Sequence, residues 1–190
     1  MEYQFKIQIK GLSKPPVWRK VIVPAEFTFM DFHYVIQIAF GWEDCHLFQF
    51  KDKEYQGSLF IEAPSEEYFG FGAKPKDASK VKLSQVFGDK FRKLLYEYDF
   101  GDSWVHEITL EEISDGNRKE AVCIEAKGSC PPEDCGGRFG FENMKKIFQT
   151  MPNSDEANEY RDWLGLDEGE TLNTETAFDL DKMNKALKEL

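Results

Sequence analysis

The chain has 190 residues, of which 41% are apolar and 15% aromatic; this composition indicates one well-packed domain and excludes a disordered chain. Its formal net charge of −11 would repel a phosphate backbone, so we do not expect non-specific binding to DNA or RNA. No signal peptide precedes the first alternating segment, and no apolar stretch is long enough to cross a bilayer, so we expect a cytoplasmic protein with no membrane partner. In that compartment the four cysteines would be thiols or metal ligands rather than disulfides.

Two strands are predicted at the start of the chain. Apolar and polar side chains alternate over residues 3–10, which is typical of a strand with one buried face. Residues 11–16 contain a glycine and two prolines and predict a turn, and residues 17–23 predict a second strand that pairs antiparallel with the first. We expect Trp18 and Trp42 to be core anchors rather than platforms that stack on a ligand.

A helix is expected over residues 29–40. Thr28 and Asp31 have the spacing of a capping box, in which each side chain binds the backbone N–H of the other residue. Gly41 stands where a left-handed residue commonly ends a helix. Residues 46–50 then alternate as a third strand.

The middle of the chain predicts a loop followed by a hairpin. Residues 57–80 are rich in Gly, Pro, Ser and charged residues without periodicity, so we expect a long loop. A short helix is predicted over residues 83–91. Residues 94–113 form a predicted β-hairpin with its turn at residues 99–102, and residues 121–125 are expected to be a returning strand.

Helices are predicted over residues 141–150, 154–164 and 178–190. Strands with one early helix, followed by helices, indicate an α+β fold: a mainly antiparallel sheet packed by the early helix and by C-terminal helices. We expect residues 1–150 to form the α+β core domain. Residues 151–190 hold eleven acidic and four basic residues, and we expect an acidic helical extension packed on the same domain.

The hairpin carries the first group of candidate site residues. His106 shares the mainly apolar face of its strand, and Asp99 or Asp102 at the turn is close enough in sequence to reach back to it. A carboxylate paired with an imidazole would be an acid–base pair or a ligand pair, which makes these three residues the candidate catalytic groups. In the alternative interpretation the two aspartates cap turn amides and His106 is hydrogen-bonded in the core.

A cysteine pair forms the second candidate. Cys130 and Cys135 bracket four residues, which is the outer limit of ligand spacing in structural zinc sites. One pair is only half of a zinc site, so further ligands would have to come from His46, His106, Cys123 or Cys45. Buried thiols without metal are the alternative, and the spacing disfavours a thioredoxin-like redox pair.

Five segments resemble the plasmid Ri open-reading-frame-three-like family, whose members are often labelled transposon passenger proteins. The matching segments are residues 15–19, 31–42, 46–50, 96–106 and 130–137. The resemblance implies a single α+β domain and no established activity. Some relatives carry a resolvase-like label, but a chain with five arginines and a net charge of −11 lacks the basic surface that DNA recombination requires.

These observations lead to three functional hypotheses. The first is a non-enzymatic binding or interaction module linked to mobile elements, whose partner is a protein or a small ligand and whose site lies near one end of the sheet. The second is a zinc-dependent hydrolase in which Asp99, Asp102 or Glu133 acts as the base. The third is a regulatory protein whose acidic residues 151–190 bind a basic partner.

Overall fold

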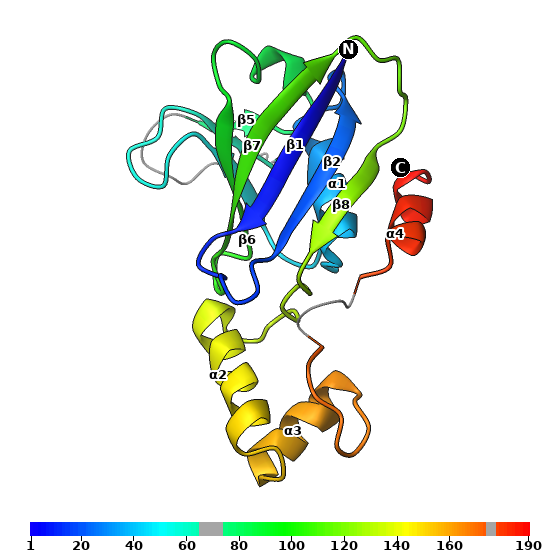
Figure 1. Ribbon diagram of the computed structural model, residues 1–190. Helices are drawn as coiled ribbons and strands as arrows, with labels where there is room; N and C mark the ends of the chain where they lie inside the picture. The colour runs from blue at the N-terminus through cyan, green and yellow to red at the C-terminus, as the bar shows by residue number, and fades with distance from the viewer. Residues whose placement is uncertain (65–73, 174–177) are drawn as a thin grey trace.

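One mainly antiparallel sheet forms the body of the computed structural model, which describes residues 1–64, 74–173 and 178–190 (Figure 1). Within these ranges the sheet has eight strands. In their spatial order the strands are β5 (Lys76–Asp77), β4 (Phe60–Glu62), β3 (Phe48–Lys51), β6 (Lys93–Tyr98), β7 (Trp104–Ser114), β1 (Glu2–Ile9), β2 (Trp18–Pro24) and β8 (Val122–Lys127). The helices are α1 (Phe29–Phe40), a 3₁₀ turn η1 (Leu83–Gln85), α2 (Gly137–Thr150), α3 (Asp155–Leu164) and α4 (Leu180–Leu187). The α+β class predicted from the sequence is confirmed.

The centre of the sheet is made by two predicted pairings, both of which are confirmed. Strands β1 and β2 pair antiparallel, and β6 and β7 form the antiparallel hairpin. The strand predicted over residues 121–125 is observed as β8. Because β1 occupies the free edge of β7, β8 crosses over and pairs with β2.

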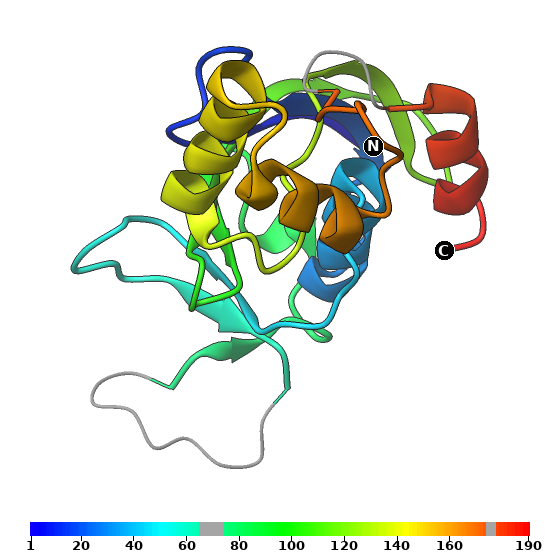
Figure 2. The same cartoon turned by 90° about the horizontal axis from the view of Figure 1, so that it is seen from below.

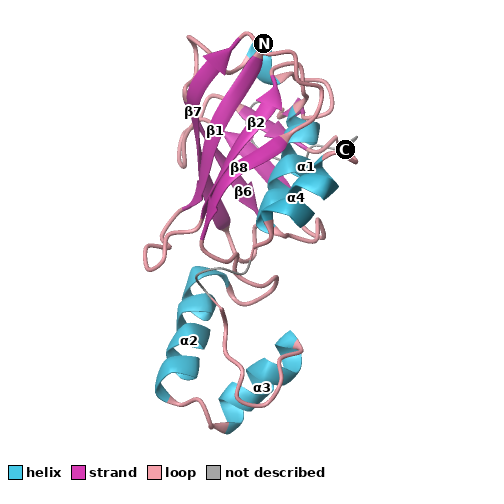
Figure 3. Ribbon diagram, turned by 45° about the vertical axis from the view of Figure 1, so that its right-hand side comes forward, coloured by secondary structure: helices cyan, strands magenta, loops and turns pink. Residues whose placement is uncertain are grey.

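Helix α1 covers the inner face of the sheet (Figure 3). The predicted capping box is confirmed, because Thr28 Oγ1 accepts a hydrogen bond from Asp31 N at 3.1 Å and Asp31 Oδ2 accepts one from Thr28 N at 2.8 Å. Gly41 ends the helix in the left-handed conformation, with φ at 86°, as predicted. Aromatic rings fill the space between α1 and the sheet. The ring centroid of Phe32 on α1, for example, lies 4.9 Å from that of Phe5 on β1.

The prediction that Trp18 is a core anchor is wrong, whereas Trp42 is buried as predicted, with 6% exposure. Successive side chains of a strand point to opposite faces, and Trp18 lies on the outer face with Lys6 Nζ 5.0 Å from its ring centroid. Its neighbour Arg19 therefore points inward, in phase with Val21, and is 1% exposed.

Two short strands lie in the region predicted to be a loop. Strand β4 pairs with β3, and β5 pairs parallel to β4. The remainder of that prediction includes residues 65–73, which lie outside the described residues. The helix predicted over residues 83–91 is only the 3₁₀ turn η1.

The C-terminal helices occupy two separate places. Helices α2 and α3 pack on each other and lie across one end of the sheet, as the view from below shows (Figure 2). Helix α4 packs against β8 and α1. Its Asn184 side chain accepts a hydrogen bond from Cys123 N at 2.8 Å and donates one to Cys123 O at 2.9 Å, so it binds the outer edge of β8. No helix in the described ranges is long and apolar enough to cross a membrane.

Candidate functional site

The β6–β7 turn and the cysteine loop meet at the end of the sheet that faces α2. Asp102 Oδ2 accepts a hydrogen bond from Gly136 N at 3.1 Å. Gly137 has φ at +64°, and a Cβ atom there would lie 2.5 Å from the carbonyl oxygen of Asp102. A glycine is therefore required where the two segments touch.

A third segment, the loop after α1, joins them. Glu133 Oε1 accepts hydrogen bonds from Glu43 N at 2.7 Å and from the hydroxyl of Tyr98 at 3.0 Å. The same hydroxyl accepts a hydrogen bond from Cys45 N at 3.1 Å. Glu133 and Tyr98 thus connect the cysteine loop, the end of β6 and the loop that carries Cys45 and His46.

Helix α1 holds this third loop from inside the core. His33 is 1% exposed; its Nε2 lies 2.7 Å from Asp44 Oδ1 and its Nδ1 lies 2.8 Å from the Tyr96 hydroxyl. Gln37 Oε1 accepts a hydrogen bond from Asp44 N at 2.9 Å. Burial lowers the pKa of His33, although Asp44 opposes this effect. These contacts fix the position of Asp44 and therefore the path of the loop that carries Cys45 and His46.

His46 lies at the centre of a cluster of ligand atoms. Its Nδ1 is 3.8 Å from Asp99 Oδ1, and its Nε2 is 3.2 Å from Asp134 Oδ1 and 3.8 Å from Glu133 Oε2. Ligand atoms of Cys45, His46 and Glu133 all lie within 4.8 Å of one another, as do those of His46, Asp99 and Asp134. The His46 side chain is 27% exposed, so solvent reaches the cluster.

Two atoms of the cluster have no hydrogen bond. His46 Nε2 and Glu133 Oε2 are each buried and form none with the described residues. The Asp134 oxygen is near enough to His46 for an ion pair, but the geometry is not that of a hydrogen bond. A buried polar atom without a partner costs about 1–3 kcal/mol, so these atoms are suited to binding a water molecule, an ion or a ligand.

The hairpin residues predicted as a catalytic group are placed apart. His106 is fully buried, with Nδ1 2.9 Å from Trp104 O, and it forms no ion pair with Asp99 or Asp102 in the described part of the chain. Burial lowers the pKa of His106 to about 4, although nearby backbone carbonyls oppose this effect. Asp99 accepts a hydrogen bond from Gly101 N at 2.9 Å, so both aspartates bind backbone amides. Of Asp99, Asp102 and His106, only Asp99 belongs to the His46 cluster among the described residues.

The cysteine pair is likewise not part of that cluster. Among the described residues, neither Cys130 nor Cys135 joins a group of three ligand atoms within 4.8 Å. Burial raises the pKa of Cys135 to about 12 and raises that of Cys130 well above its ordinary value. Cys130 lies beside the positive charge of Arg19, which disfavours a metal cation there. The thiol next to His46 is Cys45, which is exposed.

Sequence reasoning did not identify Asp134 or Tyr98 as site residues, and it considered Glu133 only as a base. All three lie in residues 96–106 and 130–137, two of the segments that carry the family resemblance, which is the one signal that would have found them. Asp44, Asp99 and Asp134 share a second feature, a positive φ of 52–54°. Aspartate tolerates this conformation better than most residues, because its short side chain can bind the local backbone.

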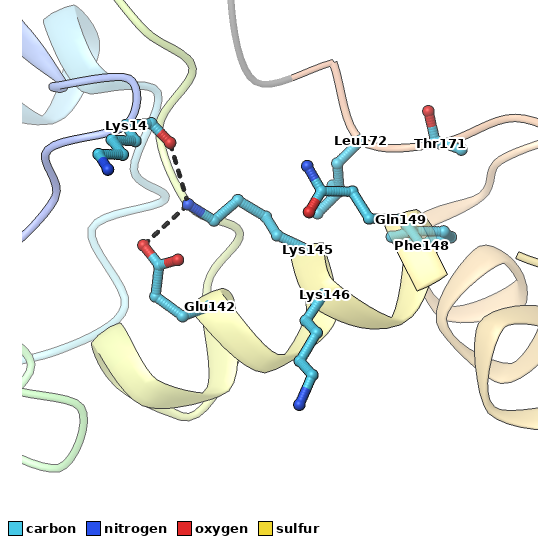
Figure 4. A pocket seen from close by; sticks show the side chains of 8 residues that line it. All are labelled: Lys14, Glu142, Lys145, Lys146, Phe148, Gln149, Thr171 and Leu172. Atoms are coloured by element: carbon cyan, nitrogen blue, oxygen red, sulfur yellow. Dashed lines mark hydrogen bonds and ion pairs between the residues drawn. The ribbon is translucent and has the colours of Figure 1, made fainter. Parts of the chain in front are cut away.

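Two surface hollows lie near this end of the molecule. One, of about 330 Å³, is bordered by Asp134, Tyr160 and Trp163, so α3 contributes aromatic rings beside the cluster. The other, of about 360 Å³, lies along α2 (Figure 4). There Lys145 Nζ donates to Lys14 O at 3.5 Å and pairs with Glu142 at 2.8 Å, so its charge is already compensated.

Comparison with known proteins places the chain in a family. Residues 1–186 match the family described as plasmid pRiA4b ORF-3-like protein. The "Uncharacterized protein y4hQ" of Sinorhizobium fredii (strain NBRC 101917 / NGR234) is 32% identical over 179 residues, which are 93% of this chain and 86% of that protein. The crystal structure of the protein of unknown function MM3350 from Methanosarcina mazei Go1 has a TM-score of 0.78 and 32% identity, over 95% of each chain. The chain therefore belongs to the plasmid pRiA4b ORF-3-like family.

Proposed function

We propose that the chain is a binding module that holds a zinc ion at Cys45, His46 and Glu133. The observation that carries this proposal is the pair of buried, unpartnered atoms, His46 Nε2 and Glu133 Oε2, which lie 3.8 Å apart. This separation is too long for a hydrogen bond. It is slightly longer than the separation of about 3.4 Å between nitrogen and oxygen ligands of a tetrahedral zinc ion, so a small movement would bring both atoms to the metal.

The types of ligand support zinc over other cations. A thiolate, an imidazole and a carboxylate are ligands that zinc accepts together, whereas calcium and magnesium prefer a full set of oxygen atoms. The carboxylates of Asp99 and Asp134 lie beside the two ring nitrogens of His46, and their negative charge favours a cation there.

A metal-dependent hydrolase is the second candidate. Three protein ligands leave a coordination position open for water, which is the arrangement of catalytic rather than structural zinc sites. The hollow bordered by Asp134, Tyr160 and Trp163 lies next to the cluster and offers a place for a substrate. Asp134 would be the base in this case, because its carboxylate lies 3.2 Å from His46 Nε2, the atom that would bind the zinc, whereas Asp99 lies at Nδ1 and would orient the ring.

The test is a measurement of bound metal by elemental mass spectrometry, on protein purified under reducing conditions without a chelator or a histidine tag. We expect stoichiometric zinc in the wild-type chain and a loss of zinc in the variants His46→Gln and Glu133→Gln. Cys123→Ser is the matched control, because the Cys123 thiol is buried away from the His46 cluster and its bonds to α4 are made by the backbone, so the variant should leave zinc unchanged. The proposal fails if the wild-type chain neither contains zinc nor binds added zinc.

A further inference from the structure

Arg19, on β2, brings a positive charge into the core. Its guanidinium group is held by backbone carbonyls: Nε donates to Ala39 O at 2.7 Å, and Nη1 lies 2.9 Å from Trp18 O, 3.0 Å from Lys127 O and 3.0 Å from Gly128 O. These bonds join the end of α1 to the end of β8. They fix the orientation of the guanidinium plane, so the group is preorganised.

No carboxylate compensates this charge in the described ranges. The charge of Arg19 acts on three titratable groups, Cys123, Cys130 and His106. Burial raises the pKa of both thiols and lowers that of His106, so all three are neutral and none is a counter-ion. Burial lowers the pKa of Arg19 itself, but a guanidinium stays protonated in proteins. A buried cation without a counter-ion is costly, and such groups are normally paired.

Arg19 also borders a cavity. The cavity has a volume of about 460 Å³ and lies between α1 and α4, and the Arg19 hydrogen bonds to described residues use Nε and Nη1, which leaves Nη2 free to bind a ligand. The two helices lie beside each other on the same side of the sheet (Figure 3). The other walls are mainly apolar, with the rings of Phe40 and Phe178 at 5.0 and 5.2 Å from Arg19 Cζ, and with Met183 and Ala186 from α4.

The charges around the cavity favour a monoanion. Lys182 borders the cavity, is exposed and forms no ion pair with the described residues. Asp179 also borders the cavity, but its carboxylate caps α4 by accepting a hydrogen bond from Lys182 N at 3.0 Å. Two cations and one carboxylate give the cavity a net positive charge in a chain whose net charge is −11. Asp179 and the carbonyl end of α1 oppose negative charge, and they oppose the two charges of a dianion such as phosphate more strongly than the single charge of a monoanion.

We infer that this cavity binds a small apolar carboxylate, whose carboxylate group accepts hydrogen bonds from Arg19 Nη2 and whose apolar body lies between Phe40 and Met183. The volume is in the range of small-molecule sites, which combine apolar walls with a few polar groups that fix the orientation of the ligand. A carboxylate supplies the missing counter-ion, and a charge-assisted hydrogen bond to arginine is among the stronger polar contacts available. This site is independent of the proposed zinc site, because the two share no residue.

The test is a calorimetric titration of the full chain with octanoate, with 1-octanol as the uncharged probe and inorganic phosphate as the dianionic one. We expect saturable binding of octanoate, at least about tenfold tighter than that of either other probe. Equal binding of 1-octanol would overturn the role of Arg19, and absence of saturable octanoate binding would overturn the site.

Substitution of Arg19 would remove its hydrogen bonds to four backbone carbonyls and destabilise the fold, so the variants change the cavity walls instead. Ala186→Phe should fill the cavity and weaken octanoate binding by at least about tenfold, with the folded state checked by thermal melting. Lys182→Met should weaken binding by about two- to fivefold. The matched control Lys185→Met removes the same charge from a position on α4 that does not border the cavity, and it should leave binding unchanged. Unchanged binding in Ala186→Phe would contradict the inference.

Discussion

The Tyr98 hydroxyl donates a hydrogen bond of 3.0 Å to Glu133, and through this contact the end of β6 fixes the carboxylate beside His46. Burial raises the pKa of Tyr98, so the hydroxyl keeps its proton and remains a donor. The free oxygen of Glu133 is left facing His46 Nε2.

Tyr98→Phe should therefore destabilise the chain and loosen the cluster. The substitution leaves Cys45 N without its acceptor and removes one of the two donors to Glu133 Oε1. We expect the free energy of unfolding to fall by about 1–3 kcal/mol in urea denaturation, together with weaker zinc binding. Tyr55→Phe is the control, since Tyr55 is 81% exposed and its substitution should change neither quantity. Equal stability of the two variants would show that the Tyr98 hydroxyl does not organise the site.

Gly137→Ala tests the contact between the cysteine loop and the hairpin turn. The new Cβ atom would lie 2.5 Å from Asp102 O at a φ of +64°. Gly165→Ala is a matched control, because Gly165 has φ at +65° and no atom lies within 4 Å of the position that its new methyl group would take. Both variants carry the cost of the left-handed conformation, about 1–2 kcal/mol, but only Gly137→Ala also carries the clash. We expect a clearly larger loss of unfolding free energy for Gly137→Ala, and equal losses would contradict the described approach of the two loops.

The buried His106 predicts a dependence of stability on pH. Its pKa is about 4 in the folded chain and near its ordinary value of 6.5 in the unfolded chain. Between these pH values the unfolded chain binds more protons, so the free energy of unfolding rises with pH. Below pH 4 the free energy of unfolding should be lower than above pH 6.5 by up to about 3 kcal/mol, because His106 must then be protonated in the core. Urea denaturation of the wild-type chain and His106→Gln across this range isolates the contribution, and identical pH profiles would contradict it.

The cysteines should differ in their reaction with iodoacetamide. Cys45 is exposed, whereas burial raises the pKa values of Cys123, Cys130 and Cys135, the last to about 12. The thiolate is the reactive form, so the folded chain should be modified first at Cys45, as peptide mass spectrometry would show. Added zinc should protect Cys45, while urea should expose all four thiols. Modification of Cys130 or Cys135 at the same rate as Cys45 would be inconsistent with this burial.

The elements that depend on local pattern were predictable from the sequence. Alternation predicted β1 and the hairpin, and the capping box with Gly41 predicted both ends of α1. The partner of β8 was not predictable, because it depends on β1 already occupying the edge of β7. The inward direction of Arg19 was missed because a charged residue in a strand is usually placed on the solvent side.

The candidate site was predicted only in part, for a similar reason. The spacing of Cys130 and Cys135 is a local pattern and drew attention to that pair. The cluster around His46 combines residues from three loops that are separated by about fifty and thirty-five positions along the chain, at Cys45, Asp99 and Glu133. Only the order of strands in the sheet brings these loops to one place. The sequence did identify His46, Asp99 and Cys45 as candidates, but not their association with Asp134.

Titration of the metal-free chain with cobalt(II), followed by visible absorption, tests the proposed zinc site most directly. Cobalt substitutes for zinc in tetrahedral sites, and a bond to a thiolate gives a distinct charge-transfer absorption. We predict saturable absorption with the thiolate band in the wild-type chain, loss of that band in Cys45→Ser, and no change in Cys130→Ser. Absence of saturable absorption, or a thiolate band that persists in Cys45→Ser and disappears in Cys130→Ser, would contradict the assignment of the site to Cys45, His46 and Glu133.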